Sequence, residues 1–82
     1  MHYVYILKSK KDRGLYIGFS NDLRRRMNQH KEGKVIATKN RRPLSLIYYE
    51  AFSSIDDAKV REEYLKSGYG RKNLKAMLKN SL

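Results

Sequence analysis

Apolar residues occur along the chain in two patterns, as short strand-like runs and as helix-like stripes. The strand-like runs are Tyr3–Leu7, Leu15–Phe19 and Leu44–Phe52, which are rich in residues that favour strands. A polar stretch that contains Asp12-Arg13-Gly14, a turn signal, separates the first two runs. The pattern therefore predicts a β-hairpin, followed later in the chain by a third strand.

Helix-like spacing occurs between and after these runs. One helix is predicted over about Asp22–His30, with a stop near Gly33. A second follows Ser53-Ser54 and ends around Gly68-Tyr69-Gly70, and a third covers Arg71–Leu82. The order β-β-α-β-α-α predicts an α/β protein of the α+β type, a small three-stranded, mainly antiparallel sheet flanked by three helices. We expect residues 1–82 to form one domain, because 82 residues suffice for one core.

Charge indicates the class of partner. The chain has 19 Lys and Arg against 8 Asp and Glu, a formal net charge of +11. Such a field attracts polyanions, of which nucleic acid is the commonest. An anionic membrane is disfavoured, because no segment combines a basic face with a wide Trp/Phe/Leu face. A basic surface that served only solubility would mix the two signs more evenly.

Composition also excludes several kinds of site. The absence of cysteine excludes disulfides, a thiolate zinc site and a cysteine nucleophile, and two histidines are too few for an all-histidine metal cage. No apolar run approaches the roughly 18 residues that a membrane span needs. Tyr3–Leu7 is too short for the core of a signal peptide. We therefore expect a cytoplasmic protein without a membrane partner, and no obligate protein partner is evident.

Helical phase distinguishes three consecutive arginines in the first predicted helix. Arg26 shares the apolar stripe with His30, whereas Arg24 and Arg25 point elsewhere. A purely structural explanation is that the stem of Arg26 packs along the stripe and that His30 caps the helix end. The alternative is that both side chains belong to a functional site.

One carboxylate, Glu62, lies within the apolar face of the second predicted helix, with Lys66 at the edge of that face. Glu63 is rotated away from it. A carboxylate on a core-facing stripe is costly unless it is paired or binds a metal. Glu62 is therefore either the partner of a core-side arginine, such as Arg26, or a ligand for a hard metal ion.

The predicted hairpin contributes two tyrosines. Tyr5 lies on one face of the first strand, and Tyr16 shares a face of the second strand with Gly18. A glycine at this position lets another group approach closely. Each tyrosine alone is typical of packing with a polar end. Together with Arg26 and Glu62 they outline one candidate site.

A basic loop is predicted between the first helix and the third strand, over about Lys34–Pro43. It is either a nucleic-acid contact or a solvated loop. The cations predicted to contact phosphates lie in this loop and on the two helices beside it: Lys34, Lys39, Arg41, Arg42, Arg24, Arg25 and Lys66.

These residues resemble the GIY-YIG nuclease family, in its small stand-alone bacterial branch, which is related to the N-terminal nuclease domain of a bacterial excinuclease. The resemblance covers about Tyr3 to Leu78, and the first triplet begins with Tyr3 where the family's motif has Gly. The matching segments and residues are Tyr3-Val4-Tyr5, Leu15-Tyr16-Ile17-Gly18, Asn21-Asp22-Leu23, Arg26, His30, Asn40-Arg41-Arg42-Pro43, Glu62 and Leu65-Lys66-Ser67-Gly68.

The resemblance implies phosphodiester hydrolysis with a divalent cation, Mg²⁺ or Mn²⁺, that Glu62 holds. It implies that Arg26 stabilises charge on the scissile phosphate. Tyr5 or Tyr16 would orient or deprotonate the attacking water, which requires a nearby cation to lower a tyrosine pKa from about 10. Of the two we expect Tyr5 to be the base, and His30 is an alternative base or phosphate contact.

The resulting prediction is a Mg²⁺-dependent, structure-directed DNA endonuclease that acts at branched, nicked or damaged DNA in repair or recombination. RNA is an open alternative substrate. Gly18 and Asn73 are expected to support the site. The main alternative is a non-catalytic nucleic-acid-binding module with the same fold. A basic protein-interaction module would leave the tyrosines, Arg26 and Glu62 unexplained.

Overall fold

A computed structural model describes residues 1–82 and confirms the predicted α+β fold, with one additional helix. None of its helices has the length and hydrophobicity that crossing a membrane requires. The strands are β1 (His2–Ser9), β2 (Leu15–Ser20) and β3 (Leu44–Phe52). The helices are α1 (Leu23–Lys31), α2 (Ile36–Lys39), α3 (Ile55–Lys66) and α4 (Gly68–Met77).

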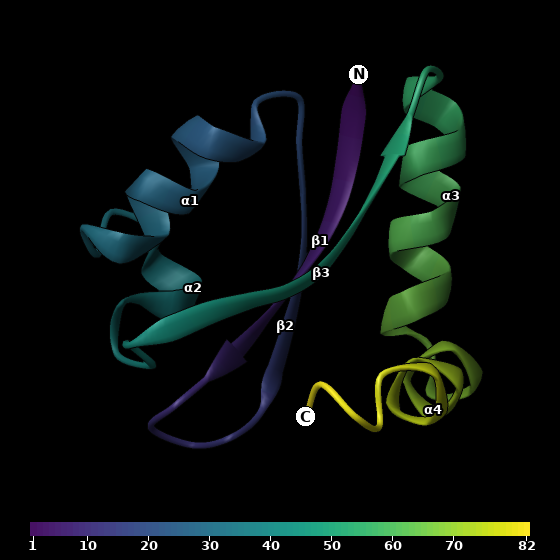
Figure 1. Cartoon of the computed structure of the whole chain (residues 1–82). Helices are drawn as coiled ribbons and strands as arrows, with labels where there is room; N and C mark the ends of the chain where they lie inside the picture. Colours follow the sequence, from purple (N-terminus) through teal and green to yellow (C-terminus); the bar gives the residue numbers. More distant parts are fainter.

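The three strands form an antiparallel sheet in the order β2-β1-β3, so β1 is central and β2 is an edge strand. Tyr5 on β1 pairs with Gly18 on β2 and with Tyr49 on β3. Helices α1 and α2 lie on one side of the sheet, and α3 and α4 lie on the other (Figure 1). Side chains at the β2 edge can therefore be reached from both helical layers.

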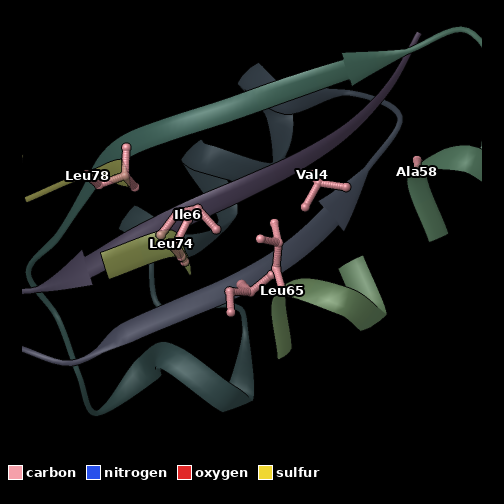
Figure 2. Packing of buried hydrophobic residues seen from close by; sticks show 7 residues of the cluster. Val4, Ile6, Ala58, Leu65, Leu74 and Leu78 are labelled. Atoms are coloured by element: carbon pink, nitrogen blue, oxygen red, sulfur yellow. The ribbon is translucent and has the colours of Figure 1, made fainter. Parts of the chain in front are cut away.

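The main hydrophobic core fills the space between the sheet and the α3–α4 pair, as Figure 2 shows. Strand alternation directs one set of β1 and β2 side chains to this side. The opposite set, which includes Tyr5, faces α1. The buried core residues are Val4, Ile6, Ile17, Ala58, Leu65, Leu74 and Leu78.

Side-chain N-caps fix the starts of helices α1 and α3. Asp22 accepts a hydrogen bond from the backbone N–H of Arg25 at 3.1 Å, and Ser54 accepts one from the N–H of Asp57 at 3.4 Å. After α1 the chain turns at Gly33, whose φ of +76° is a conformation that favours glycine. These three boundaries agree with the sequence pattern.

The last helix begins earlier than the sequence predicts. Ser67 accepts a hydrogen bond from the N–H of Gly70 at 3.1 Å and thereby starts α4 at Gly68, three residues before the predicted start. A Cβ atom at position 70 would overlap the carbonyl oxygen of Tyr64. Gly70 thus permits close packing of α4 against the end of α3, whereas the sequence pattern interprets it as part of a helix terminator.

Two further expectations are wrong in detail. The predicted basic loop contains α2, a single turn whose apolar spacing is too short to detect, with Thr38 buried in it. The apolar face of α3 that contains Glu62 is expected to be buried, yet Ile55, the first residue on that face, is 47% exposed, because it begins the helix, beyond the part that covers the core.

Candidate active site

Tyr5 lies at the centre of the candidate site. Its side chain is fully buried, and its ring lies over Gly18 on the neighbouring strand. A Cβ atom at Gly18 would overlap the ring and the hydroxyl of Tyr5. The missing side chain on β2 therefore lets the hydroxyl of a central-strand tyrosine extend toward the sheet edge.

A chain of hydrogen bonds connects Tyr5 to α1 and α2. The Tyr5 hydroxyl lies 2.7 Å from Nε2 of His30, and Nδ1 of His30 lies 2.7 Å from Oγ1 of Thr38. All three side chains are buried. Burial, together with the positive charge of Arg26, lowers the pKa of His30 to about 4, so its imidazole is neutral near pH 7. His30 does not cap the end of α1, because both of its ring nitrogens have side-chain partners in the interior.

Arg26 reaches the same hydroxyl from α1. Its Nε lies 3.4 Å from the Tyr5 hydroxyl oxygen, and its Nη1 donates to Oε1 of Gln29 at 3.0 Å. Arg26 is half-buried, whereas Arg24 and Arg25 are exposed, as helical phase predicts. A short cleft of about 390 Å³, which Arg25 also lines, lies beside Arg26.

Tyr16 completes the aromatic part of the site. Its ring centroid lies 6.4 Å from that of Tyr5 and 5.4 Å from that of His30. It is half-buried, and the Tyr16 hydroxyl makes no hydrogen bond within the protein. Its hydroxyl is therefore free to bind a water molecule or a substrate.

Glu62 approaches the edge from α3, on the other side of the sheet. Its side chain is 15% exposed, and its two carboxylate oxygens lie 3.1 Å from Lys66 and 3.9 Å from Lys59. An ion pair with Arg26, one of the two alternatives that the sequence offers for Glu62, is therefore absent. Its negative charge nevertheless acts on Tyr5 across the edge strand, since it contributes to raising the pKa of that hydroxyl. No group of three or more His, Asp or Glu side chains gathers into a potential metal site, so Glu62 does not belong to such a cluster.

The condition for Tyr5 as a base is not met within this chain. Burial raises the pKa of its hydroxyl, and this effect outweighs the hydrogen bond from Arg26, which lowers it. The sequence-based expectation required the pKa to fall. The structure therefore assigns Tyr5 to the neutral, hydrogen-bonding form near pH 7.

The basic residues that the sequence predicts as phosphate contacts differ in their surroundings. Arg41 is held by Asp12 at 2.7 and 3.2 Å, and Arg42 donates to the backbone carbonyls of Lys39 and Lys31 while covering Gly33. These two arginines therefore also stabilise the loop. The other members of the set are all exposed: Arg24, Arg25, Lys34, Lys39 and Lys66.

Asn73 and Thr38 have roles that the sequence does not predict. Asn73 donates a hydrogen bond to the hydroxyl of Tyr64, and none of its hydrogen bonds reaches Tyr5, Arg26 or Glu62. Thr38, by contrast, joins the hydrogen-bond chain and has no signal in the sequence, because α2 is too short to predict.

Comparison with known proteins places this geometry in a family. The GIY-YIG catalytic domain family matches residues 1–75. The chain is 43% identical over 67 residues to a UPF0213 protein of Clostridium perfringens, covering 80% of this chain and 71% of that protein. It is 40% identical over 75 residues to a UPF0213 protein of Staphylococcus saprophyticus, covering 90% of each.

A solved structure agrees with these matches. The solution NMR structure of a UPF0213 protein from Bacillus halodurans aligns with a TM-score of 0.59 and 35% sequence identity, covering 93% of this chain and 83% of that one. The match extends over both helical layers and the sheet. The chain therefore belongs to the GIY-YIG catalytic domain family, together with the stand-alone UPF0213 proteins.

Proposed function

We propose that this protein is a divalent-metal-dependent endonuclease that hydrolyses DNA phosphodiester bonds at branched, nicked or damaged sites. A GIY-YIG catalytic domain indicates nuclease activity and a nucleic-acid substrate. One observation carries the proposal for this chain: an oriented cation, Arg26, and a nearly buried carboxylate, Glu62, come from helices α1 and α3 on opposite sides of the same sheet (Figure 1).

Arg26 is the residue we assign to the scissile phosphate. Tyr5 and Gln29 fix its Nε and Nη1, so its guanidinium is oriented before a substrate arrives. An oriented cation stabilises the charge that develops on a phosphate during displacement, and it needs no reorganisation to do so. Tyr5 holds Arg26 in place, His30 in turn holds Tyr5, and neither gives a proton to the reaction in this scheme.

Glu62 is the residue we assign to the metal. Mg²⁺ in phosphoryl-transfer sites is commonly held by one or two carboxylates, waters and a substrate phosphate, so a single, nearly buried carboxylate beside a phosphate site fits it. When bound, the metal lowers the pKa of a water and neutralises phosphate charge. Lys59 and Lys66 now neutralise Glu62, and they can turn toward phosphates once a cation replaces them.

Tyr16 is the residue we assign to the attacking water. Its hydroxyl is free of partners within the protein, whereas Tyr5 is bound by His30 and Arg26. His30 is neutral, but its Nε2 lies against Tyr5, so it reaches the site only through that hydroxyl. A hydroxyl that is free to bind water satisfies the geometric requirement for a base.

Nicking of supercoiled plasmid tests the proposal. We expect the parent protein to nick DNA with Mg²⁺ and to be inactive with a chelator. Glu62→Gln removes the metal's anchoring charge at nearly constant volume and should abolish nicking while sparing DNA binding. Glu63→Gln is the matched control, because that neighbouring carboxylate is exposed. Equal losses in the two variants, or nicking that resists chelation, would contradict the proposed site.

The second candidate function is a non-catalytic nucleic-acid-binding module. It is favoured by the two lysines that neutralise Glu62 and by the raised pKa of Tyr5. For such a module, DNA binding would be present, and neither Mg²⁺ nor Mn²⁺ would produce nicks on plasmid, branched or nicked substrates.

A further inference from the structure

A second concentration of positive charge lies at the hairpin end of the sheet, away from Tyr5. A cavity of about 400 Å³ opens between the β1–β2 turn, the loop before β3 and α4. No acidic side chain lines this cavity. Like charges at close range repel one another, so an anion that enters relieves the repulsion. The cationic side chains that line it are Lys8, Arg13, Arg41, Arg71 and Lys75.

The backbone conformation of Arg13 gives an independent indication that its cationic side chain has a role at this cavity. Its φ of +62° makes it the only residue other than glycine with a positive φ. Glycine or asparagine adopts this conformation at less cost than arginine. The turn is fixed by a hydrogen bond from the Arg13 N–H to the Ser9 carbonyl at 2.9 Å and by Asp12, which accepts from the Gly14 N–H at 2.8 Å. Arg13 thus keeps a long cationic side chain at the edge of the cavity, at a position where glycine would fit with less strain.

Arg41 is also fixed at this cavity. Asp12 accepts hydrogen bonds from its Nε at 2.7 Å and its Nη2 at 3.2 Å. This pairing neutralises one charge of the cluster, and it orients the guanidinium before any ligand binds. The remaining cations come from β1, the turn and α4, so three separate parts of the fold converge on one space.

The cavity and the candidate active site both lie at β2, but on opposite faces of the sheet. Leu15, which lines the cavity, and Gly18, which lies under Tyr5, are three residues or about 10 Å apart along the strand. Helix α3 packs against β1 and β2, and its C-terminal end meets α4 (Figure 1). About 10 Å along a duplex axis spans about three phosphates of one strand.

We propose that the cavity formed by Lys8, Arg13, Arg41, Arg71 and Lys75 binds a backbone phosphate of the DNA strand that is cut, about three nucleotides to one side of the scissile bond. This inference rests on the proposed function, because it takes DNA as the substrate. Phosphate contacts of this kind fix the register of a nucleic acid on a protein and carry no sequence information. The cavity thus sets which bond reaches Arg26 and Glu62.

Binding measured without cleavage tests this proposal. Glu62→Gln protein in EDTA is titrated with a nicked duplex by fluorescence anisotropy over a series of salt concentrations. Adding Arg71→Ala and Lys75→Ala should make the slope of log affinity against log salt shallower by about 1 to 2. The matched control is Lys72→Ala with Lys79→Ala, which removes the same charge from the same segment but not from the cavity. The salt-dependence slope of this control should change by less than half as much as the slope of the Arg71→Ala, Lys75→Ala variant.

Neutral methylphosphonates locate the phosphate. Each phosphate near the nick is replaced singly, and we expect a loss of affinity at a position about three nucleotides away on one side. In the Arg71→Ala, Lys75→Ala variant, a methylphosphonate at that position should cause no further loss of affinity. The methylphosphonate and the double substitution remove the same contact. Arg13→Gly should likewise weaken binding, while its urea unfolding midpoint stays equal to the parent's or rises.

Equal slope changes in the two double variants, or a methylphosphonate penalty that persists in the Arg71→Ala, Lys75→Ala background, would overturn the proposal. So would the absence of DNA binding. Failure of the proposed function has a different signature: no nicking with Mg²⁺ or Mn²⁺, while the methylphosphonate pattern and its loss in the double variant remain. In that case the cavity is still a phosphate site, but in a binding module.

Discussion

The arrangement at Gly18 shows how a single residue determines the geometry of the candidate site. Tyr5 belongs to the central strand, where a hydroxyl would ordinarily be enclosed by its neighbours. Because position 18 on the edge strand has no side chain, the Tyr5 ring lies over that strand and its hydroxyl meets His30 and Arg26. Any larger residue at position 18 would displace this ring and with it the orientation of Arg26.

The two tyrosines are expected to differ in their contribution to cleavage. Tyr16→Phe should lower the single-turnover rate by about 10²- to 10⁴-fold, because the hydroxyl that handles the water's proton is lost. Tyr5→Phe should lower it less, since it removes a neutral hydroxyl that orients Arg26. Rates are measured at saturating enzyme, with circular dichroism as the check on folding. A larger loss for Tyr5→Phe would restore Tyr5 as the base.

The buried histidine makes stability depend on pH. Its pKa is about 4 in the folded protein and about 6.5 in the unfolded chain, so the unfolded chain binds the proton first as the pH falls. Stability should be full above about pH 6.5 and should decrease toward pH 4, by about 2–3 kcal/mol at pH 4.5. Urea unfolding at a series of pH values measures this decrease.

The second histidine supplies the control for that experiment. The His2→Gln variant should still lose stability as the pH falls toward 4. His2 is only half-buried, and it lies outside the Tyr5–His30–Thr38 chain of hydrogen bonds. His30→Gln should flatten the dependence between about pH 6.5 and 4.5. A decrease of the same size in both variants would assign the effect to other groups.

At the scale of elements, the sequence predicted what depends on periodicity and capping. Alternation placed Tyr5 and Gly18 correctly, helical phase separated Arg26 from Arg24 and Arg25, and Ser54 and Asp22 marked helix starts. Neither the helix α2 nor the role of Thr38 could be predicted, because one helical turn has no periodicity to detect. The neutralisation of Glu62 by Lys59 and Lys66, in place of Arg26, depends on how α3 packs against the sheet.

The junction of α3 and α4 provides a prediction at this scale. Gly70→Ala should destabilise the protein by about 1–3 kcal/mol, because the new Cβ would meet the backbone of Tyr64 and Leu65, which cannot move aside. Gly68→Ala is the matched control, since no atom lies near its Cβ and alanine is the better helix former. Urea unfolding compares the two variants. A loss for Gly68→Ala as large as that for Gly70→Ala would argue against packing as the cause.

At the scale of the whole molecule, the fold places two groups of charged side chains along one edge strand. The two helical layers bring Arg26 and Glu62 to β2 from opposite sides, and the hairpin and α4 place a cationic cavity further along the same strand. Of the nineteen Lys and Arg side chains, only Lys34, Arg41, Lys59, Arg61 and Lys66 lie within 4.0 Å of a carboxylate. Most of the positive charge is therefore available to phosphates.

This free charge predicts strong salt dependence of DNA binding. If about five phosphates are neutralised, the slope of log affinity against log salt should be about −4 to −5, so affinity should fall by roughly 10²- to 10³-fold between about 50 and 200 mM salt.

Arg24→Ala with Arg25→Ala should make the slope shallower by about 1 to 2 without changing the urea midpoint, because both side chains are exposed and unpaired. Arg41→Ala should instead lower the urea midpoint, since it breaks the pairing with Asp12. A flat slope in the parent protein would contradict an electrostatic mode of binding, whatever the outcome of the cleavage assay.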